Sequence, residues 1–393
     1  MTQKLCVITG SRAEYGLLKP LMRIIDADPE YDLQVIATGM HLSPQFGSTY
    51  KDIEGDGFRI DRKINILTAS DDEIGVAKSV GLGISGFADA FDQLKPDLII
   101  IVGDRFEILS AAIAALCIRV QIAHVHGGEL TTGAIDDAIR HAITKIAHFH
   151  FVAAEPYRRR VIQMGEQPAR VFNVGGLGVD VISKTPVLDR CALAHRLGIN
   201  TLMPRNLLVT FHPATLERDS PEIQMKQLLS ALEKLVDVGL IFTYANADAS
   251  GRKINKLIEQ FVITHEHSHA FPSLGQQLYL SCMVHFDGVV GNSSSGILEA
   301  PVLKKGAINI GRRQNGRLQA SSVINCDPTS EQISAALSTL FSAEFQARLP
   351  QARSPYGDGG ASERILGILK QFKLEKCLEK NFFDISTDFF ETE

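Results

Sequence analysis

Two stretches of sequence decide the fold: Leu98-Ile-Ile-Ile-Val-Gly103 and Leu207-Leu-Val-Thr-Phe211. Each is a continuous apolar run, which is typical of a parallel strand that is buried on both faces. Similar runs alternate with longer helical patterns along the whole chain, and this alternation predicts βαβ units with parallel sheets. We therefore expect an α/β fold in which each half of the chain forms its own doubly wound, Rossmann-like domain.

The length of the chain also indicates two domains. The chain has 393 residues, whereas a single hydrophobic core stops growing near ~250–300 residues. We place an N-terminal domain in residues 1–182, a C-terminal domain in residues 183–360, and a helix and tail in residues 361–393 that cross back to the first domain. Two such domains predict a central cleft in which a ligand binds.

Composition and charge exclude several classes of function. Apolar residues make up 45% of the chain and the net charge is −5, so a disordered chain or a general attraction to nucleic acid or anionic lipid is not expected. We expect no signal peptide and no membrane span. The six cysteines show no metal-binding spacing, which favours reduced thiols and a cytoplasmic location.

Polar residues follow the expected strands of the first half. Arg12 comes after the strand Leu5–Thr9, and Asp104 comes after the most apolar strand. The carboxyl edge of a parallel sheet is where open α/β folds bind ligands, and a guanidinium there suits a diphosphate. The alternatives are that Arg12 is a solvated turn residue and that Asp104 caps the next helix, Phe106–Ile118.

The densest polar cluster is His124-Val-His126-Gly-Gly-Glu129, which is followed by Asp136 and Asp137 at the start of an expected helix. An aspartate near a helix N-terminus is stabilised by the helix dipole, which accounts for one of the two without a catalytic role. The whole group predicts a general acid and base in a ligand site. A metal site with both histidines and a carboxylate as ligands is the alternative, and we favour the site without metal.

Two further motifs carry less weight. The glycines of residues 81–86 spell G-x-G-x-x-G, but they follow a helical pattern instead of a strand, so a bound NAD is not expected. The alternating histidines of residues 265–269 are expected to lie in a solvated segment before a strand.

The second half contains an anion-binding pattern. His212 ends one expected strand, and residues 288–299 (GVVGNSSSGILE) carry another strand into an asparagine, three serines and a helix. Free backbone N–H groups at such a helix start bind phosphate, and Glu299 would then reach the sugar hydroxyls of a nucleotide. Serine and asparagine also cap helices without any ligand. Several arginines follow the next strand, in residues 312–317.

Taken in order, these motifs resemble those of the hydrolysing UDP-N-acetylglucosamine 2-epimerases of bacterial sialic acid synthesis. The resemblance runs from about residue 4 to about residue 370 through GSRAEYG, ATGMHLS, GDRFE, HVHGGE, DDAIRHAITK, FHPATLE, GNSSSGILEAP and INIGRRQNGR. Related enzymes of legionaminic acid synthesis, which act on UDP-N,N′-diacetylbacillosamine, are equally similar. Some relatives have glutamate at the position of His126, which leaves open whether Glu129 alone supplies an acid in this loop.

The resemblance implies a glycosyltransferase-B-like fold and the conversion of UDP-N-acetylglucosamine and water into N-acetylmannosamine and UDP. In the family the C2 proton is removed and UDP is expelled to give a 2-acetamidoglucal, and water then adds with inversion at C2. No cofactor or metal is implied. The implied partners are the UDP-sugar, its UDP product and further copies of the chain in a homodimer or homotetramer, with no nucleic acid or membrane.

The resemblance also implies roles for individual residues. The positions that match catalytic residues are Asp104, Glu129, Asp136 and His212. The positions that match contacts to UDP or to the sugar are Arg12, His41, Arg105, Asn292, Ser293, Ser294, Glu299 and Arg313. We expect Asp104 and Glu129 to divide the base and acid roles. UDP-N-acetylglucosamine is the favoured substrate and UDP-N,N′-diacetylbacillosamine the alternative; a glycosyltransferase or a sugar-nucleotide-binding regulator would not need this group of carboxylates.

Overall fold

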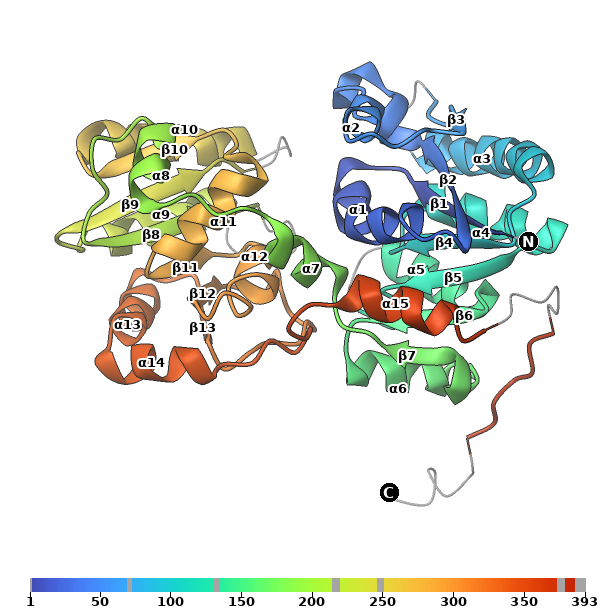
Figure 1. Ribbon diagram of the computed structural model, residues 1–393. Helices are drawn as coiled ribbons and strands as arrows, with labels where there is room; N and C mark the ends of the chain where they lie inside the picture. The colour runs from blue at the N-terminus through green and yellow to red at the C-terminus, as the bar shows by residue number, and fades with distance from the viewer. Residues whose placement is uncertain are drawn as a thin grey trace. The chain divides into compact units, whose positions relative to one another are not determined.

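The computed structural model describes residues 2–68, 73–130, 135–213, 220–245, 251–372 and 379–385. These residues form two compact units: unit 1 from the described parts of residues 1–181 and 359–393, and unit 2 from residues 182–358 (Figure 1). The end of the FHPATLE motif after Pro213 and the acidic end of the tail lie outside the described residues.

Unit 1 is built on a parallel sheet of seven strands in the order β3-β2-β1-β4-β5-β6-β7. Its strands are β1 (Gln3–Thr9), β2 (Tyr31–Thr38), β3 (Arg62–Ile64), β4 (Leu98–Val102), β5 (Gln121–Val125), β6 (Phe149–Val152) and β7 (Val171–Asn173). The order reverses between β1 and β4. In doubly wound sheets the ligand site lies beyond the carboxyl ends of the two strands at this reversal.

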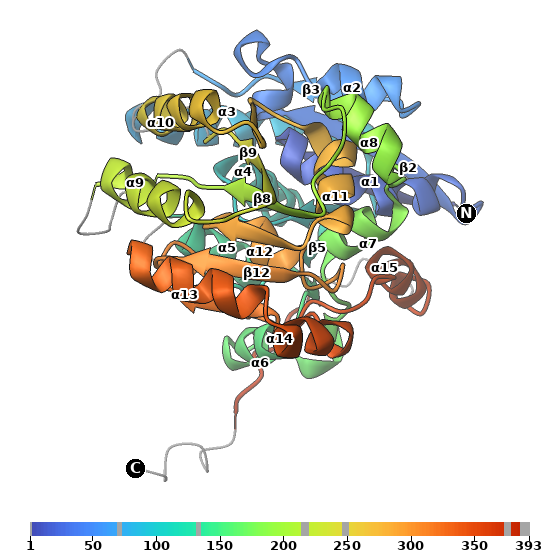
Figure 2. The ribbon, with the colours of Figure 1, turned by 90° about the vertical axis from the view of Figure 1, so that its left-hand side faces the viewer.

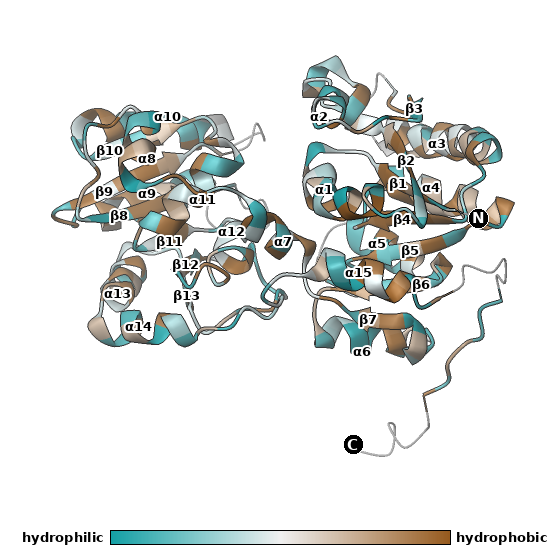
Figure 3. Ribbon diagram, viewed as in Figure 1, coloured by the Kyte–Doolittle hydropathy of each residue, from teal (hydrophilic) through white to brown (hydrophobic). Residues whose placement is uncertain are grey.

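Helices cover both faces of this sheet (Figures 1 and 2). They are α1 (Arg12–Asp26), α2 (Tyr50–Gly55), α3 (Glu73–Leu94), α4 (Phe106–Ile118), α5 (Ile135–Ile146), α6 (Glu155–Gln163) and α15 (Ala361–Leu369), while α7 (Leu177–Lys184) contains the boundary between the units. Alternate residues of the apolar strand β4 join two separate hydrophobic clusters. The strand is brown throughout in Figure 3, as burial on both faces requires.

Unit 2 repeats the same topology with six parallel strands, in the order β10-β9-β8-β11-β12-β13. The strands are β8 (Arg205–Thr210), β9 (Val238–Thr243), β10 (Ser268–Phe271), β11 (Gly288–Gly291), β12 (Gly306–Ile310) and β13 (Val323–Cys326). The helices are α8 (Arg190–Leu197), α9 (Pro221–Leu232), α10 (Gly251–Thr264), α11 (Gly275–His285), α12 (Ser294–Leu298), α13 (Ser330–Leu340) and α14 (Ala343–Arg348). His269 lies inside β10, so the expectation that the 265–269 histidines precede a strand is wrong for this residue.

The G-x-G-x-x-G string lies inside α3, as its helical context predicts, and its glycines serve packing. A Cβ on Gly83 would meet the Ser110 side chain of α4 at 2.7 Å, and a Cβ on Gly86 would meet Ile64 at 2.5 Å. In the part of the chain that the structure describes, Ile74–Leu94 is the one helix long and apolar enough to cross a membrane, with a mean hydropathy of 1.2. Phe87 and Phe91 of this helix are buried in the core of unit 1, and a core helix meets the same criteria of length and composition.

Residues 359 onward return to unit 1 through a buried carboxylate. Asp180, which is 1% exposed, accepts the N–H groups of Ala361 at 2.9 Å and Ser362 at 2.7 Å. It therefore caps the N-terminus of α15, whose own N-cap position is held by Gly360 without a side-chain bond. Arg364 of the same helix donates two hydrogen bonds to the carbonyl of Val174.

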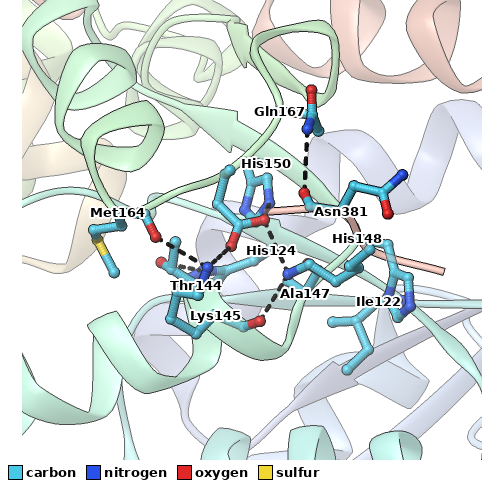
Figure 4. A network of polar contacts seen from close by, with 12 residues as sticks. Ile122, His124, Thr144, Lys145, Ala147, His148, His150, Met164, Gln167 and Asn381 are labelled. Carbon is cyan, nitrogen blue, oxygen red and sulfur yellow. Dashed lines mark hydrogen bonds and ion pairs between the residues drawn. The ribbon is translucent and has the colours of Figure 1, made fainter. Parts of the chain in front are cut away.

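Residues 379–385, which we call the C-terminal strap, lie against the ends of α5 and α6 (Figure 4). Lys380 donates to the carbonyls of Lys145 and Ala147 and lies 2.9 Å from the buried carboxylate of Glu166. Burial would raise the pKa of Glu166, but hydrogen bonds from His150 and from the Lys145 ammonium outweigh it and lower that pKa to about 2. The strap thus caps a helix end and completes a buried charge cluster.

Replacing Lys380 by Met should lower the free energy of unfolding by about 2 kcal/mol, because the Glu166 carboxylate loses a cationic donor while the aliphatic stem remains. The pKa of Glu166 in the folded protein lies below its ordinary value of 4.5, so this difference should be complete above about pH 4.5 and shrink as the pH falls toward 2. Urea denaturation across this range measures it. The matched change Lys95→Met breaks an exposed pair with Asp92 and should cost less than about 0.5 kcal/mol; equal effects would show that the strap adds no stability.

Candidate active site

Asp104 lies at the strand-order reversal of unit 1, directly after β4. Gly103 turns the chain there with a φ of +80°, and its N–H donates to Val125 at 3.0 Å. Arg105 holds the N-cap position of α4, so Asp104 does not cap this helix. The Asp104 carboxylate instead pairs with the guanidinium of Arg140 from α5.

Arg140 ties together three segments that carry carboxylates. Its side chain is 7% exposed. Besides Asp104, it donates to the backbone carbonyl of Glu129 at 2.8 Å and lies 3.5 Å from Asp137. The segments after β4 and β5 are thereby fixed to the first turns of α5, where Asp136 also lies. The structure therefore brings together the three acids expected at this edge.

Burial raises the pKa of Asp104 above its ordinary value, and the charges of Asp136 and Glu129 raise it further against the opposing effect of Arg140. A carboxylate whose charged form is destabilised is a stronger base than an exposed one. Perturbation by burial together with named charged neighbours is typical of catalytic groups.

His124 is a structural member of this cluster. Its Nε2 lies 2.8 Å from the carbonyl oxygen of Gly103 and its Nδ1 lies 3.2 Å from the hydroxyl of Thr144 in α5. Burial lowers the pKa of His124 to about 3, so the ring is neutral near pH 7. The expectation that both histidines of the HVHGGE loop belong to an acid–base site is therefore wrong for His124.

Arg12 and His41 are two further residues of unit 1 that we expect to contact the ligand. The side chain of Arg12 is exposed and can reach a ligand, whereas that of His41 is buried and cannot. Arg12 begins α1 with a side chain that is 78% exposed, 3.9 Å from Asp52. His41 is fully buried, with ring nitrogens 2.9 Å from the Thr9 hydroxyl and 2.8 Å from the Thr49 hydroxyl. Burial lowers the pKa of His41 to about 4, so it is a neutral support of the loop after β2.

Arg105 is held by two carboxylates that the sequence did not single out. Its guanidinium donates to Glu107 at 2.9 Å and lies 3.8 Å from Glu14. Glu107 is fully buried, and burial raises the pKa of Glu14 to about 7. The capping-box spacing from Ser11 to Glu14 is a signal that could have found one of them, because Glu14 accepts the N–H of Gly10 at 2.7 Å.

His212 and Asn292 lie after β8 and β11, the two strands at the order reversal of unit 2, and are hydrogen-bonded to each other. The Asn292 amide accepts the backbone N–H of His212 at 2.7 Å and donates to its carbonyl at 2.8 Å. Gly291, with a φ of +138°, is needed because a Cβ there would overlap the carbonyl of Thr210. Two neighbouring strand ends are thus clamped together through one buried side chain.

The serines after Asn292 form a row of hydroxyl groups with Tyr279, which we call the polar wall. Ser293 caps α12 by accepting from the N–H of Ser295, whose hydroxyl lies 2.5 Å from that of Tyr279. Ser294 is the first residue of this helix, which has only five residues and hence a small dipole. Tyr279 is a further residue of this wall that sequence reasoning missed, since no local motif marks it.

Glu299 and Arg313 flank the same wall. Burial raises the pKa of Glu299 to about 7. Arg313 donates to the backbone carbonyl of Asn292 at 3.0 Å, beside the buried amide of Gln314, which donates to the same oxygen at 2.9 Å. An exposed arginine, serine hydroxyls and a protonatable carboxylate therefore gather at one sheet edge.

The described residues contain no group of three or more His, Cys, Asp or Glu side chains placed to hold a metal ion. His265 uses its Nδ1 in a 2.7 Å hydrogen bond to the carbonyl of Phe261 and stacks on that ring.

Residues 23–370 match the family model described as UDP-N-acetylglucosamine 2-epimerase. The chain belongs to this family. The hydrolysing 2-epimerases that the motifs resemble are therefore its relatives, and it is an enzyme of the hydrolysing UDP-sugar 2-epimerase class.

Three relatives of this epimerase illustrate the range of substrates. It is 43% identical to a GDP/UDP-N,N′-diacetylbacillosamine 2-epimerase (hydrolyzing) of Campylobacter jejuni, over 98% of this chain and 99% of that one. It is 34% identical to a UDP-N,N′-diacetylbacillosamine 2-epimerase (hydrolyzing) of Legionella pneumophila, over 95% and 97%. It is also 34% identical to a UDP-N-acetylglucosamine 2-epimerase of Neisseria meningitidis, over 88% and 90%.

The fold of the epimerase also matches solved structures. A UDP-GlcNAc 2-epimerase of Neisseria meningitidis, solved with UDP-GlcNAc bound, aligns with a TM-score of 0.77 at 16% identity, over 94% of this chain and 100% of that one. The expected glycosyltransferase-B-like fold with two Rossmann-like units is confirmed.

Proposed function

We propose that this epimerase converts UDP-N,N′-diacetylbacillosamine and water into UDP and the free sugar inverted at C2. The observation that carries this proposal is the 43% identity, over nearly the whole of both chains, to the Campylobacter jejuni enzyme named for that substrate. The sequence motifs taken alone favour UDP-N-acetylglucosamine. The relatives named for the two substrates favour the reverse order.

In the proposed reaction Asp104 removes the proton from C2 of the sugar. The C2 electron pair forms a C1–C2 double bond as the C1–oxygen bond to UDP breaks, which yields a glycal. Burial and the charges of Asp136 and Glu129 raise the pKa of Asp104, which makes it a stronger base than an exposed aspartate. Arg140 keeps its carboxylate oriented.

Water then adds across the double bond of the glycal. The hydroxyl bonds to C1, and C2 receives a proton on the face opposite to the one that was lost. We assign this proton to Glu129 in its acid form, and the remaining proton of the water passes to the carboxylate that Glu129 then presents, while the proton taken by Asp104 goes to solvent. Glu129 follows β5 and Asp104 follows β4, so the two carboxylates come from different strand ends. Asp136 lies at the start of α5, and its negative charge raises the pKa of Asp104.

The leaving UDP needs positive charge and hydrogen-bond donors. In the proposal these come from Arg12 in unit 1 and from His212, Ser293, Ser294 and Arg313 in unit 2, with Glu299 accepting from the ribose hydroxyls. Donors that are fixed before the reaction stabilise a developing diphosphate without reorganisation. The clamp between Asn292 and His212 is such a fixed element.

UDP-N-acetylglucosamine is the second candidate substrate. The 34% identity to the Neisseria meningitidis enzyme named for it supports this alternative. The two sugars share the acetamido group at C2 and differ at C4 and C6, so both would undergo the same elimination.

The test compares UDP-N,N′-diacetylbacillosamine, its GDP counterpart and UDP-N-acetylglucosamine in D₂O. We expect kcat/KM to be highest for the UDP-diacetyl sugar, by about tenfold or more over UDP-N-acetylglucosamine, with one deuterium at C2 of the released sugar. Equal or reversed kcat/KM values would move the assignment to the second candidate. UDP release without deuterium at C2 would contradict the elimination.

Asp104→Asn is the matched variant for this assay. It should lower kcat by about 10²–10⁴-fold while leaving the Kd for UDP nearly unchanged, because the amide cannot accept the C2 proton but occupies the same space. Turnover at the wild-type rate would remove Asp104 from the base role.

Binding of UDP near pH 7 should release protons from the enzyme. The pKa of Glu299 is about 7 in the free protein, and hydrogen bonds from ribose hydroxyls would favour its ionised form. Calorimetry in buffers of different ionisation enthalpy measures the number of protons. The proton count should fall in Glu299→Gln, and an identical count in both proteins would show that Glu299 does not face the nucleotide.

A further inference from the structure

His126 has an unusual backbone conformation at a polar strand end. Its φ is +65°, a left-handed value that non-glycine residues rarely adopt and that clusters at functional sites. Its backbone N–H donates to the carbonyl of Phe151 in β6 at 2.9 Å, which holds the residue in place. The conformation is therefore built into the loop between β5 and Glu129.

The ring of His126 lies between two partners on different segments. Its Nε2 accepts the backbone N–H of Leu177 at 3.2 Å. Because that lone pair is in use, the neutral ring carries its proton on Nδ1. Nδ1 lies 3.5 Å from Oε1 of Glu129, so an N–H donor faces this carboxylate.

Leu177 is the first residue of α7, and this helix contains the boundary between the two units after Val181. The N–H groups of a first helical turn have no partner within the helix. The ring of His126 accepts a hydrogen bond from one of these N–H groups, so the position of the ring depends on the position of the first turn of α7. A shift of α7 would move the donor that faces Glu129.

We propose that His126 is a positioning residue that couples α7, the connection between the two units, to the carboxylate of Glu129. His126 is no general base in this arrangement, because the nitrogen that could accept a proton is bound to Leu177. This inference depends on one part of the proposed function, which is the catalytic role of Glu129. It assigns a role to the residue that replaces glutamate in some relatives.

Two substitutions separate the two halves of the coupling. The amide of Asn reaches the place of Nδ1 and tolerates a positive φ, so His126→Asn keeps the donor toward Glu129 and loses the bond to Leu177. The longer Gln reaches the place of Nε2, so His126→Gln keeps the bond to Leu177 and loses the donor. We expect both variants to lower kcat by about 10–100-fold with the Kd for UDP within about twofold of wild type.

His148 provides the matched control. Its Nδ1 also accepts a backbone N–H, that of Ile122 at 3.3 Å, at the amino end of the same sheet. His148→Asn should change the melting temperature about as much as His126→Asn and leave kcat unchanged. A loss of kcat that follows the melting temperature in all variants would mean that His126 only stabilises the fold.

A double-mutant cycle decides the coupling. If His126 acts through Glu129, adding His126→Ala to Glu129→Gln should lower kcat no further than Glu129→Gln alone. Independent, multiplicative losses would overturn the coupling and leave the proposed function intact. Full activity of Glu129→Gln would overturn the inference and the role of Glu129 together, while the wild-type substrate assay would still test the substrate.

Discussion

The acid edge of unit 1 depends on the guanidinium of Arg140. Carboxylates gathered at one partly buried edge repel one another and resist ionisation, so some cation has to lie among them. Arg140 meets this need from a rigid helix, and it binds one acid through its carboxylate and another through its backbone. Its planar fork makes both contacts at once, which a lysine ammonium could not do with the same geometry. The orientation of Asp104 and the path of the Glu129 loop therefore have a common origin.

The two units use the same topology for different chemistry. In each sheet the proposed site residues follow strands at or next to the order reversal, which are β1, β4 and β5 in unit 1 and β8, β11 and β12 in unit 2. Unit 1 has carboxylates there, with raised pKa values at Asp104 and Glu14. Unit 2 has hydroxyls, an amide clamp and an exposed arginine. The shared strand order thus places polar side chains at the same edge of both sheets, and the loop residues decide which groups lie there.

Much of this arrangement could be predicted because it follows from local pattern. The helix Phe106–Ile118 has the predicted ends, and the acids of the first half lie at one sheet edge, as parallel topology requires. The short edge strands β3 and β10 carry few apolar side chains, so no apolar run in the sequence marks them. The buried state of His41 and the approach of Glu14 to Arg105 depend on contacts between segments that are distant in the sequence. The expected cleft between the domains stays a prediction.

Unit 1 is discontinuous, and this affects the order in which the chain matures. Unit 2 is a single segment, so it is complete as soon as residue 358 has been synthesised. Unit 1 lacks Ala361, Ile365, Leu366 and Leu369 of its hydrophobic core until α15 is added. The acid-bearing domain is therefore the last to be finished even though its first strand is made first. A nascent or truncated chain that ends before α15 has every proposed catalytic residue and an incomplete core to hold them.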